Sequence, residues 1–127
     1  KRLPLKILRS IGDHFSMIDM LIQRLKSIKC IDEIYICTSD DAVDDILEDV
    51  AARNCIKIYR GSPDNVLERL LTVSEIENAE IVLRITGDNP FTAVEFIDSQ
   101  VKFLRGRSLD YVRLVDVPIG ATAEVIR

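Results

Sequence analysis

The stretch of this 127-residue chain with the clearest capacity for chemistry is Arg84–Phe91, which reads RITGDNPF. It continues an apolar run, Glu80–Ile85, so Gly87 and Asp88 stand where a buried strand would end. A carboxylate in that place can hold Mg²⁺, which takes one or two carboxylates together with phosphate oxygens. The same letters also suit a plain Gly-Asp-Asn turn before a proline, and spacing alone leaves both interpretations open.

Three cations within the first six residues surround a proline: Lys1, Arg2 and Lys6. Arginine binds phosphate oxygens through a planar fork, and lysine adds a point charge, so such a loop can wrap a polyphosphate. Basic clusters are also common on solvated termini, and charge alone favours that plainer interpretation.

A second candidate segment, Arg60–Arg69, joins the end of a predicted strand to the start of a predicted helix. Gly61 would let a ligand approach the backbone, and free N–H groups at the start of the helix would suit an anion. Helix capping by Ser62 and Pro63 explains the same letters, although capping does not require Arg60. The two interpretations are equally open.

Two further polar residues invite a functional interpretation. Glu124 is the one charged residue in the segment 117–126, where it either faces the same site or is an ordinary exposed strand residue. The only histidine, His14, falls in a predicted turn, which favours a surface position over a catalytic one.

Three cysteines, Cys30, Cys37 and Cys55, show no C-x-x-C spacing. This pattern argues against a disulfide framework or a zinc site. Because all three sit among apolar residues, we expect them to be buried free thiols in a reducing, cytoplasmic environment.

The candidate loops need a scaffold, and the hydrophobic pattern predicts strands that alternate with helices. Helix starts are predicted at Ser16, at Ser39–Asp41, at Ser62 with Pro63, and at a Thr92–Glu95 capping box. Extended segments are predicted at residues 6–10, 33–38, 56–59, 80–85, 110–114 and 121–126. This order predicts an α/β fold with a mainly parallel sheet covered on both faces. Ligands of such sheets bind beyond the carboxyl ends of the strands, where the candidate loops lie.

Composition and charge exclude several classes of protein. A net charge of −4 argues against a nucleic-acid-binding coat, and no stretch approaches the roughly 20 apolar residues of a membrane span. The charge is uneven, since residues 1–30 carry seven Lys or Arg against two Asp or Glu, and residues 31–80 carry four against thirteen. A basic start in an acidic protein suits an anionic ligand or is a solvated face.

Taken in order, four motifs resemble the cytidylyltransferase family, in particular its spore-coat polysaccharide branch, which is related to the CMP-KDO and acylneuraminate cytidylyltransferases. They are RLPLK at 2–6, IDEIYICTS at 31–39, YRGSPDNVLER at 59–69 and RITGDNP at 84–90. The resemblance covers nearly the whole chain. It implies a Rossmann-like, three-layer nucleotidyltransferase domain that transfers CMP from CTP to an acidic sugar with Mg²⁺, releasing pyrophosphate.

The resemblance also implies roles for individual residues. Arg2 and Lys6 would grip the triphosphate, and Arg60 would lie near the nucleotide or the sugar. Thr86 and Gly87 would line the nucleotide, and Asp88 would bind the metal and, with Lys6, serve catalysis. Gly120 and Glu124 match a late P-x-G-x-D-x-E-V segment, which would place Glu124 near the sugar. The family's habit further implies a homodimer.

This chain departs from the family pattern at two places. The first strand and a C-terminal part of the family domain are absent, so we expect residues 1–127 to form a partial domain, truncated at both ends and inactive by itself. Thr122 stands where the family offers a second metal-binding aspartate. Two alternatives stay open. One is a sugar nucleotidyltransferase that uses another nucleoside triphosphate, since the basic residues and Asp88 would serve any triphosphate. The other, which Thr122 favours, is a non-catalytic nucleotide-binding relative.

Overall fold

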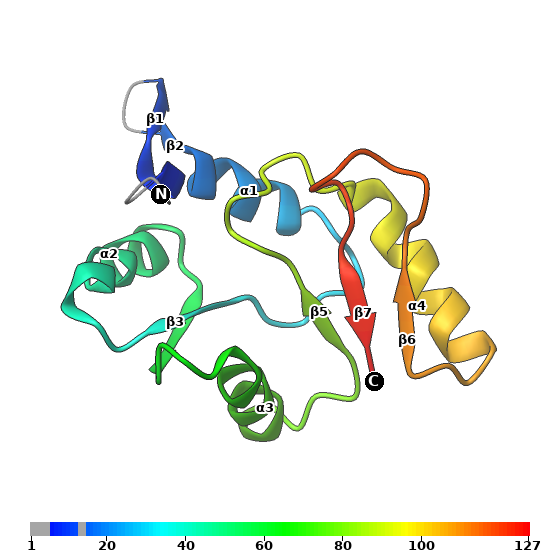
Figure 1. Ribbon diagram of the computed structural model, residues 1–127. Coiled ribbons are helices and arrows are strands. Elements are labelled where there is room, and N and C mark those ends of the chain that lie inside the picture. Colours follow the sequence, from blue (N-terminus) through cyan, green and yellow to red (C-terminus); the bar gives the residue numbers. More distant parts are fainter. Residues whose placement is uncertain (1–5, 13–14) are drawn as a thin grey trace. The chain divides into compact units, whose positions relative to one another are not determined.

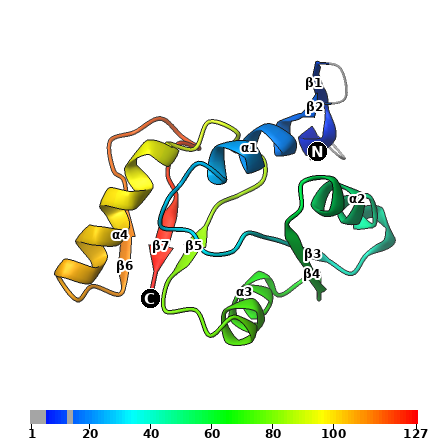
Figure 2. The ribbon, with the colours of Figure 1, turned by 180° about the vertical axis from the view of Figure 1, so that it is seen from behind.

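A computed structural model describes residues 6–12 and 15–127 and divides into two compact units. Unit 1 comprises residues 1–30 and 81–127, and unit 2 comprises residues 31–80. Figures 1 and 2 show the elements of each unit from opposite sides. The predictions made for Arg2 and His14 lie outside the described residues.

Unit 2 is a single β-α-β unit followed by a helix (Figure 1). Strand β3 (Tyr35–Ser39) pairs in parallel with β4 (Lys57–Gly61). A short 3₁₀ turn, η2 (Ala42–Asp44), and helix α2 (Ile46–Arg53) make the connection between them. Helix α3 (Val66–Ile76) follows and contacts both strands.

The sequence of α2 explains how it packs. Leu47, Val50 and Ala51 recur at helical spacing and are buried, whereas the acidic residues between them face solvent. Burial of one such aliphatic side chain contributes about 1.5–3 kcal/mol to folding. This packing places the carboxyl ends of β3 and β4 side by side, with Ser39 opposite Gly61.

Unit 1 is built around a three-stranded sheet in the order β5-β7-β6. The strands are β5 (Val82–Arg84), β6 (Tyr111–Arg113) and β7 (Glu124–Ile126). A 3₁₀ turn, η3 (Val94–Phe96), leads into helix α4 (Ile97–Gly106), which packs on β6 and β7. Ile97, Leu104 and Val125 are fully buried in this contact.

The remaining elements of unit 1 precede this sheet in the chain. They are η1 (Lys6–Leu8), the antiparallel pair β1 (Ser10–Gly12) and β2 (Phe15–Ser16), and helix α1 (Met17–Leu25). The hydroxyl of Ser16 and the carboxylate of Asp19 form a capping box that starts α1. This start confirms the helix predicted to begin at Ser16.

The α/β alternation is confirmed, but the expected mainly parallel sheet is not. Among the described strands, β3 and β4 pair in parallel, whereas β7 pairs antiparallel with both β5 and β6. The reason is the short connection 114–123, which contains no crossover helix and therefore returns the chain in the opposite direction. The predicted three-layer arrangement stays a prediction.

Several local predictions were wrong, and in each case the local contacts or backbone conformation differ from those that the motif suggests. Helix α3 begins at Val66 with Asn65 as its cap, rather than at Ser62 and Pro63. The hydroxyl of Thr92 donates to the Asn89 carbonyl and is fully buried, so it does not cap α4. Cys55 is exposed instead of buried, since it directly follows α2 with a left-handed φ of 50°.

Candidate active site

Asp88 stands in the turn that follows β5, and the ammonium group of Lys6 reaches it. Lys6 Nζ lies 2.5 Å from Asp88 Oδ2, although 82 positions separate the two residues. Hydrogen bonding from Lys6 is the main cause that lowers the pKa of the Asp88 carboxyl, and the Thr86 side chain adds to it, whereas burial opposes the shift. The side chains are 46% and 39% exposed, so a ligand can reach both charged groups from solvent.

Hydrogen bonds within the loop after β5 hold Asp88 in place. The Asn89 amide donates to the Thr86 carbonyl at 3.0 Å, and Asn89 Nδ2 donates to Thr86 Oγ1 at 2.6 Å. From helix α1, Arg24 Nη1 donates to the Pro90 carbonyl at 2.6 Å. The loop is therefore a fixed turn on which the carboxylate of Asp88 is displayed.

Gly87 sits at the centre of this turn, and packing within the protein does not explain why it is glycine. Among the described residues other than its chain neighbours, a Cβ atom built there would meet the Cδ1 atoms of Ile7 and Ile18, each at 3.9 Å, which is ordinary contact. The close approach of a ligand to the backbone is the other common use of glycine. Gly87 therefore leaves room beside Asp88 that the fold itself does not fill.

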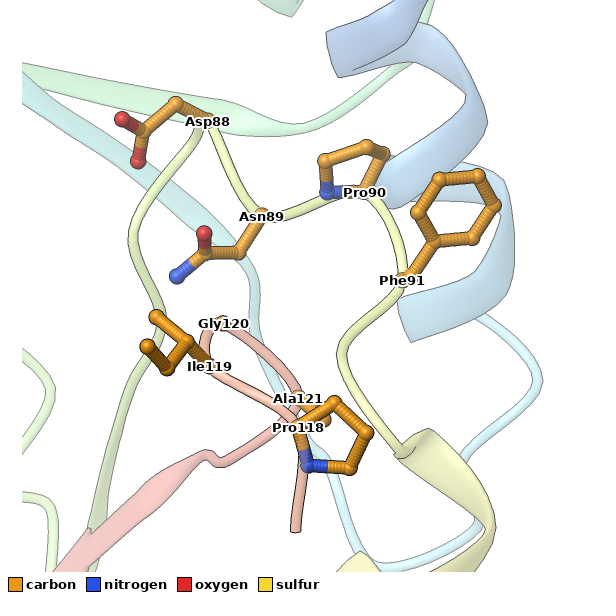
Figure 3. Close-up of a pocket in the computed structure, with 8 residues that line it drawn as sticks. All are labelled: Asp88, Asn89, Pro90, Phe91, Pro118, Ile119, Gly120 and Ala121. Atoms are coloured by element: carbon orange, nitrogen blue, oxygen red, sulfur yellow. The ribbon is translucent and has the colours of Figure 1, made fainter.

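A pocket of about 350 Å³ opens next to Asp88 (Figure 3). One wall is the segment Asp88–Phe91 and the other is the segment Pro118–Ala121. In Figure 3, Asp88 and Asn89 bring polar groups to the pocket, whereas Pro118 and Ile119 bring apolar ones. The pocket thus suits a ligand that has both an apolar face and a charged group.

The two walls are tied together by backbone contacts. The Ala93 amide donates to the Ala121 carbonyl at 2.7 Å. Gly120 has a φ of +86°, and a Cβ atom there would lie only 2.7 Å from Asn89 Oδ1. Gly120 is consequently required both for its backbone conformation and for the seating of Asn89.

Glu124 begins β7 and is paired with Arg84 at the end of β5. Arg84 Nη1 lies 2.5 Å from Glu124 Oε2, and the Tyr111 hydroxyl lies 3.3 Å from Glu124 Oε1. The hydrogen bond from Arg84 is the main cause that lowers the pKa of Glu124. Because β5 and β7 are antiparallel, this pair lies at the end of the sheet from which the chain continues to Asp88.

Asp88 is the one carboxylate that the loop after β5 displays, and its predicted role as a Mg²⁺ ligand stays a prediction. Among residues 6–12 and 15–127, no three His, Cys, Asp or Glu side chains come together as a metal cluster. Mg²⁺ commonly uses one or two carboxylates and completes its shell with water and substrate phosphates. Asp88 can supply one carboxylate, whereas the hydroxyl of Thr122 is hydrogen-bonded to the backbone of Leu114 and Ala123.

Arg60 belongs to unit 2, and the protein itself already engages all three nitrogens of its guanidinium group. Nε and Nη2 donate to the carbonyls of Ser39 and Asp41, at 3.1 and 2.9 Å. Nη2 and Nη1 each lie 2.6 Å from a carboxylate oxygen, of Asp45 and Glu48 respectively. In this arrangement Arg60 holds the loop after β3, and its predicted role in nucleotide binding stays a prediction.

Arg69 ends the motif at 59–69, which assigned it no role, and it is a buried cation of helix α3. Arg69 is only 8% exposed, and its Nη1 donates to the Ser62 carbonyl. Its Nε is buried without a hydrogen-bond partner. The letters around Arg69 read as a regular amphipathic helix, so nothing in the sequence alone signalled its burial.

Comparison with known proteins places these features in a family. The family model described as "Cytidylyltransferase" matches residues 1–127. A spore coat polysaccharide biosynthesis protein, SpsF of Bacillus subtilis, is 34% identical over 129 residues, which cover 98% of this chain and 53% of the relative. An uncharacterized protein of Methanocaldococcus jannaschii is 34% identical over 125 residues, 98% of this chain and 51% of that protein. The chain thus spans about half the length of these relatives.

Two solved structures share the fold. A cytidylyltransferase from Leptospira borgpetersenii superposes with a TM-score of 0.91 at 25% identity, covering 98% of this chain and 54% of that one. A CMP:2-keto-3-deoxy-manno-octonic acid synthetase, solved in complex with CTP, superposes with a TM-score of 0.66 at 22% identity, covering 84% and 43%. The second likeness concerns the fold alone.

Within the part of the chain that the structure describes, each helix is too short or too polar to cross a bilayer.

Proposed function

The chain belongs to the cytidylyltransferase family, and from this premise we propose that the protein takes part in transferring CMP from CTP to a hydroxyl group of an acidic sugar. The relative from Bacillus subtilis, a spore coat polysaccharide biosynthesis protein, supports a sugar as the acceptor. Membership of the cytidylyltransferase family supports CTP as the donor. The pairing of Lys6 with Asp88 beside an open pocket is the observation that carries the proposal.

The reaction is a displacement at phosphorus. The sugar hydroxyl oxygen forms a bond to the α-phosphorus of CTP, and the bond from that phosphorus to the bridging oxygen breaks. Pyrophosphate leaves with the bonding electron pair, and the hydroxyl proton passes to solvent. Such a transfer depends chiefly on positioning and on neutralising negative charge.

Residues of unit 1 supply both requirements. The ammonium group of Lys6, which is paired with Asp88, would pair with the phosphates instead when the nucleotide binds. Asp88 would then be free to hold Mg²⁺, which when bound offsets the charge of the phosphate oxygens. Thr86 and Gly87 form the turn that presents Asp88, and Gly87 lets the nucleotide approach the backbone. Glu124, held by Arg84, is the candidate for contact with the sugar.

Two alternatives are tested by the same experiments. Lys6 and Asp88 would serve any nucleoside triphosphate, so the choice of CTP needs a comparison of nucleotides. The hydroxyl of Thr122 is engaged by the backbone, and no second aspartate stands at that position. This observation favours a nucleotide-binding relative without transferase activity.

The first experiment measures the melting temperature of the full-length protein with CTP, UTP, GTP or ATP, each with and without Mg²⁺. A ligand present at 100 times its dissociation constant stabilises the native state by roughly 2.7 kcal/mol. We expect a Mg²⁺-dependent shift with CTP that is lost in Asp88→Asn. The matched control is Asp116→Asn, which removes the same charge from an exposed loop residue whose left-handed backbone suits asparagine.

Pyrophosphate release is then followed with CTP and a panel of sugar acids. Release that depends on one sugar acid and on Asp88 would establish the transferase. Nucleotide binding without release on any sugar would favour the non-catalytic relative, and equal shifts with all four nucleotides would contradict the choice of CTP. Absence of any nucleotide-induced shift would overturn the proposal as a whole.

A further inference from the structure

Arg69 of helix α3 is a buried cation whose charge is not matched by a carboxylate. Its side chain is 8% exposed, and its one hydrogen bond within the described residues runs from Nη1 to the Ser62 carbonyl. Its Nε is buried without an acceptor. Buried charges are normally paired, so a guanidinium left in this state indicates a missing anionic partner.

The absence of a partner is unexpected because unit 2 is strongly acidic. Residues 31–80 contain thirteen Asp and Glu residues, and the other basic side chains for which ion pairs are observed use them. Lys57 is paired with Glu33 and Glu77, and Arg60 with Asp45 and Glu48. Shortage of carboxylates therefore does not explain the unpaired charge of Arg69.

The sequence neighbours of Arg69 are occupied elsewhere. Glu68 accepts a hydrogen bond from Asn65 Nδ2 at 2.9 Å, and the Glu68 amide donates to Asn65 Oδ1 at 3.2 Å. This reciprocal contact fixes the first turn of α3 and keeps the carboxylate of Glu68 engaged beside the helix cap. The carboxylate that adjoins Arg69 in the sequence is thus engaged by Asn65.

The loop before α3 lies at the surface, and Gly61 is shaped to fit the side chain of Arg69. A Cβ atom at Gly61 would lie 3.2 Å from Arg69 Cγ and 3.3 Å from Tyr59 Cε1, so glycine makes room for the arginine stem. Residues 62–68 are all exposed. The first turn of α3 adds N–H groups that have no acceptor within the helix. The guanidinium group of Arg69 contacts the Ser62 carbonyl, directly after the end of β4 and shortly before the N-terminus of α3.

We propose that Arg69, the loop 61–65 and the first turn of α3 form a binding site for an oxyanion, namely a phosphoryl or carboxylate group of a ligand. Two oxygens of such a group match the planar fork of a guanidinium, and the helix N-terminus favours negative charge. The surrounding negative charge of unit 2 disfavours unspecific anion binding, so affinity there would come from the site itself. The proposal adds a second anion site to the proposed function and does not depend on Asp88.

The test is an NMR titration of the full-length protein labelled with ¹⁵N, observing the arginine Nε–H signals. The Arg69 signal is identified by its loss in Arg69→Lys. Inorganic pyrophosphate and glucuronate are added separately at millimolar concentration. We expect at least one of them to shift the Arg69 signal saturably. A response to pyrophosphate alone assigns a phosphoryl group, a response to glucuronate alone assigns a carboxylate, and a response to both assigns a general oxyanion site.

Affinity measurements by calorimetry on variants complete the test. Arg69→Lys keeps the charge but not the fork, and we expect it to weaken binding of the responding probe at least tenfold. Lys57→Gln removes one positive charge at the other end of β4 and should bind like the wild type. Asp88→Asn should also bind the responding probe like the wild type. This result would distinguish failure of the Arg69 site from failure of the proposed nucleotide site at Asp88. An unmoved Arg69 signal with both probes, or unchanged affinity in folded Arg69→Lys, would overturn the inference.

Discussion

Arg84 and Glu124 face each other across the antiparallel pair β5 and β7, with Arg84 Nη1 2.5 Å from Glu124 Oε2. The side chains are 36% and 28% exposed, so water screens part of their attraction. Exposed ion pairs contribute between about 0 and 1 kcal/mol. The contact therefore orients Glu124 more than it stabilises the sheet.

The first prediction concerns this pair. We expect Glu124→Gln and Arg84→Met each to lower the free energy of unfolding by about 1 kcal/mol or less, because each removes the same partly solvated contact. The double variant should lose less than the sum of the two, since one interaction is counted in both. Urea denaturation of the four proteins measures the coupling. Strict additivity would mean that the two side chains act independently.

The second prediction concerns Lys6 and Asp88. Replacing Lys6 by methionine removes the main cause that lowers the pKa of Asp88, so that pKa should rise toward the ordinary value of 3.8. A carbon-detected NMR titration of the Asp88 carboxyl in the two proteins measures the change. An unchanged pKa in Lys6→Met would show that the ammonium group does not contact Asp88 in solution.

The third prediction concerns the pH dependence of stability through Asp44. Burial raises the pKa of this carboxyl. Hydrogen bonds from the Ser39 and Thr38 side chains and from the Ser39 amide lower it by more than burial raises it, so the net shift of the pKa is downward. A lowered pKa in the folded state means that the stabilisation is present above the ordinary value of 3.8. It is lost as the pH falls through the lower folded value.

We accordingly expect Asp44→Ala to be less stable than the wild type at pH 7, with the difference shrinking as the pH falls below about 4. Denaturant unfolding of both proteins between pH 7 and pH 3 measures the difference. Asp49→Ala is the control, because it removes a carboxylate from an exposed residue of the same segment. A constant difference between Asp44→Ala and wild type across this range would contradict the assignment.

The fourth prediction compares two glycines. Gly120→Ala places a Cβ on a backbone with φ +86° and 2.7 Å from Asn89 Oδ1, so we expect a loss of about 1–3 kcal/mol in unfolding free energy. Gly106→Ala, at the end of α4, meets nothing within 4 Å and should be neutral or stabilising by up to about 1 kcal/mol. Chemical denaturation of the two variants decides, and equal effects would refute the assigned role of Gly120.

The fifth prediction concerns the three free thiols. Burial and the neighbouring Asp98 carboxylate raise the pKa of Cys30 to about 11, and burial raises that of Cys37, whereas Cys55 is exposed. The thiolate is the reactive form, so at pH 8 roughly one Cys30 in a thousand is reactive. Maleimide labelling followed by peptide mass spectrometry should therefore modify Cys55 first. Faster labelling of Cys30 would contradict this arrangement.

Hydrophobic spacing was sufficient to predict the alternation of strands and helices. The apolar residues of α2 and α4 recur with a period that lets them share one buried face only in a helix, so the sequence was sufficient to predict both helices. The motif RITGDNP likewise indicated a turn that presents Asp88, and the four motifs together indicated the family. These features depend on contacts between residues that are close in the chain.

Three features depended on the tertiary structure: the position of β7 between β5 and β6, the pairing of Lys6 with Asp88 and the burial of Arg69. The first two join segments that are distant in the chain, and local propensity carries no information about which distant groups will meet. The contacts of Arg69 are with residues 59–62, which meet its side chain only once β4 and α3 have packed together. Thr92 shows that a local choice can also differ from the motif, since its hydroxyl suits a helix cap but donates instead to the Asn89 carbonyl three residues earlier. The sequence by itself determined most of the elements and the family, whereas the tertiary structure decided which charges are paired and left Arg69 without a carboxylate among the described residues.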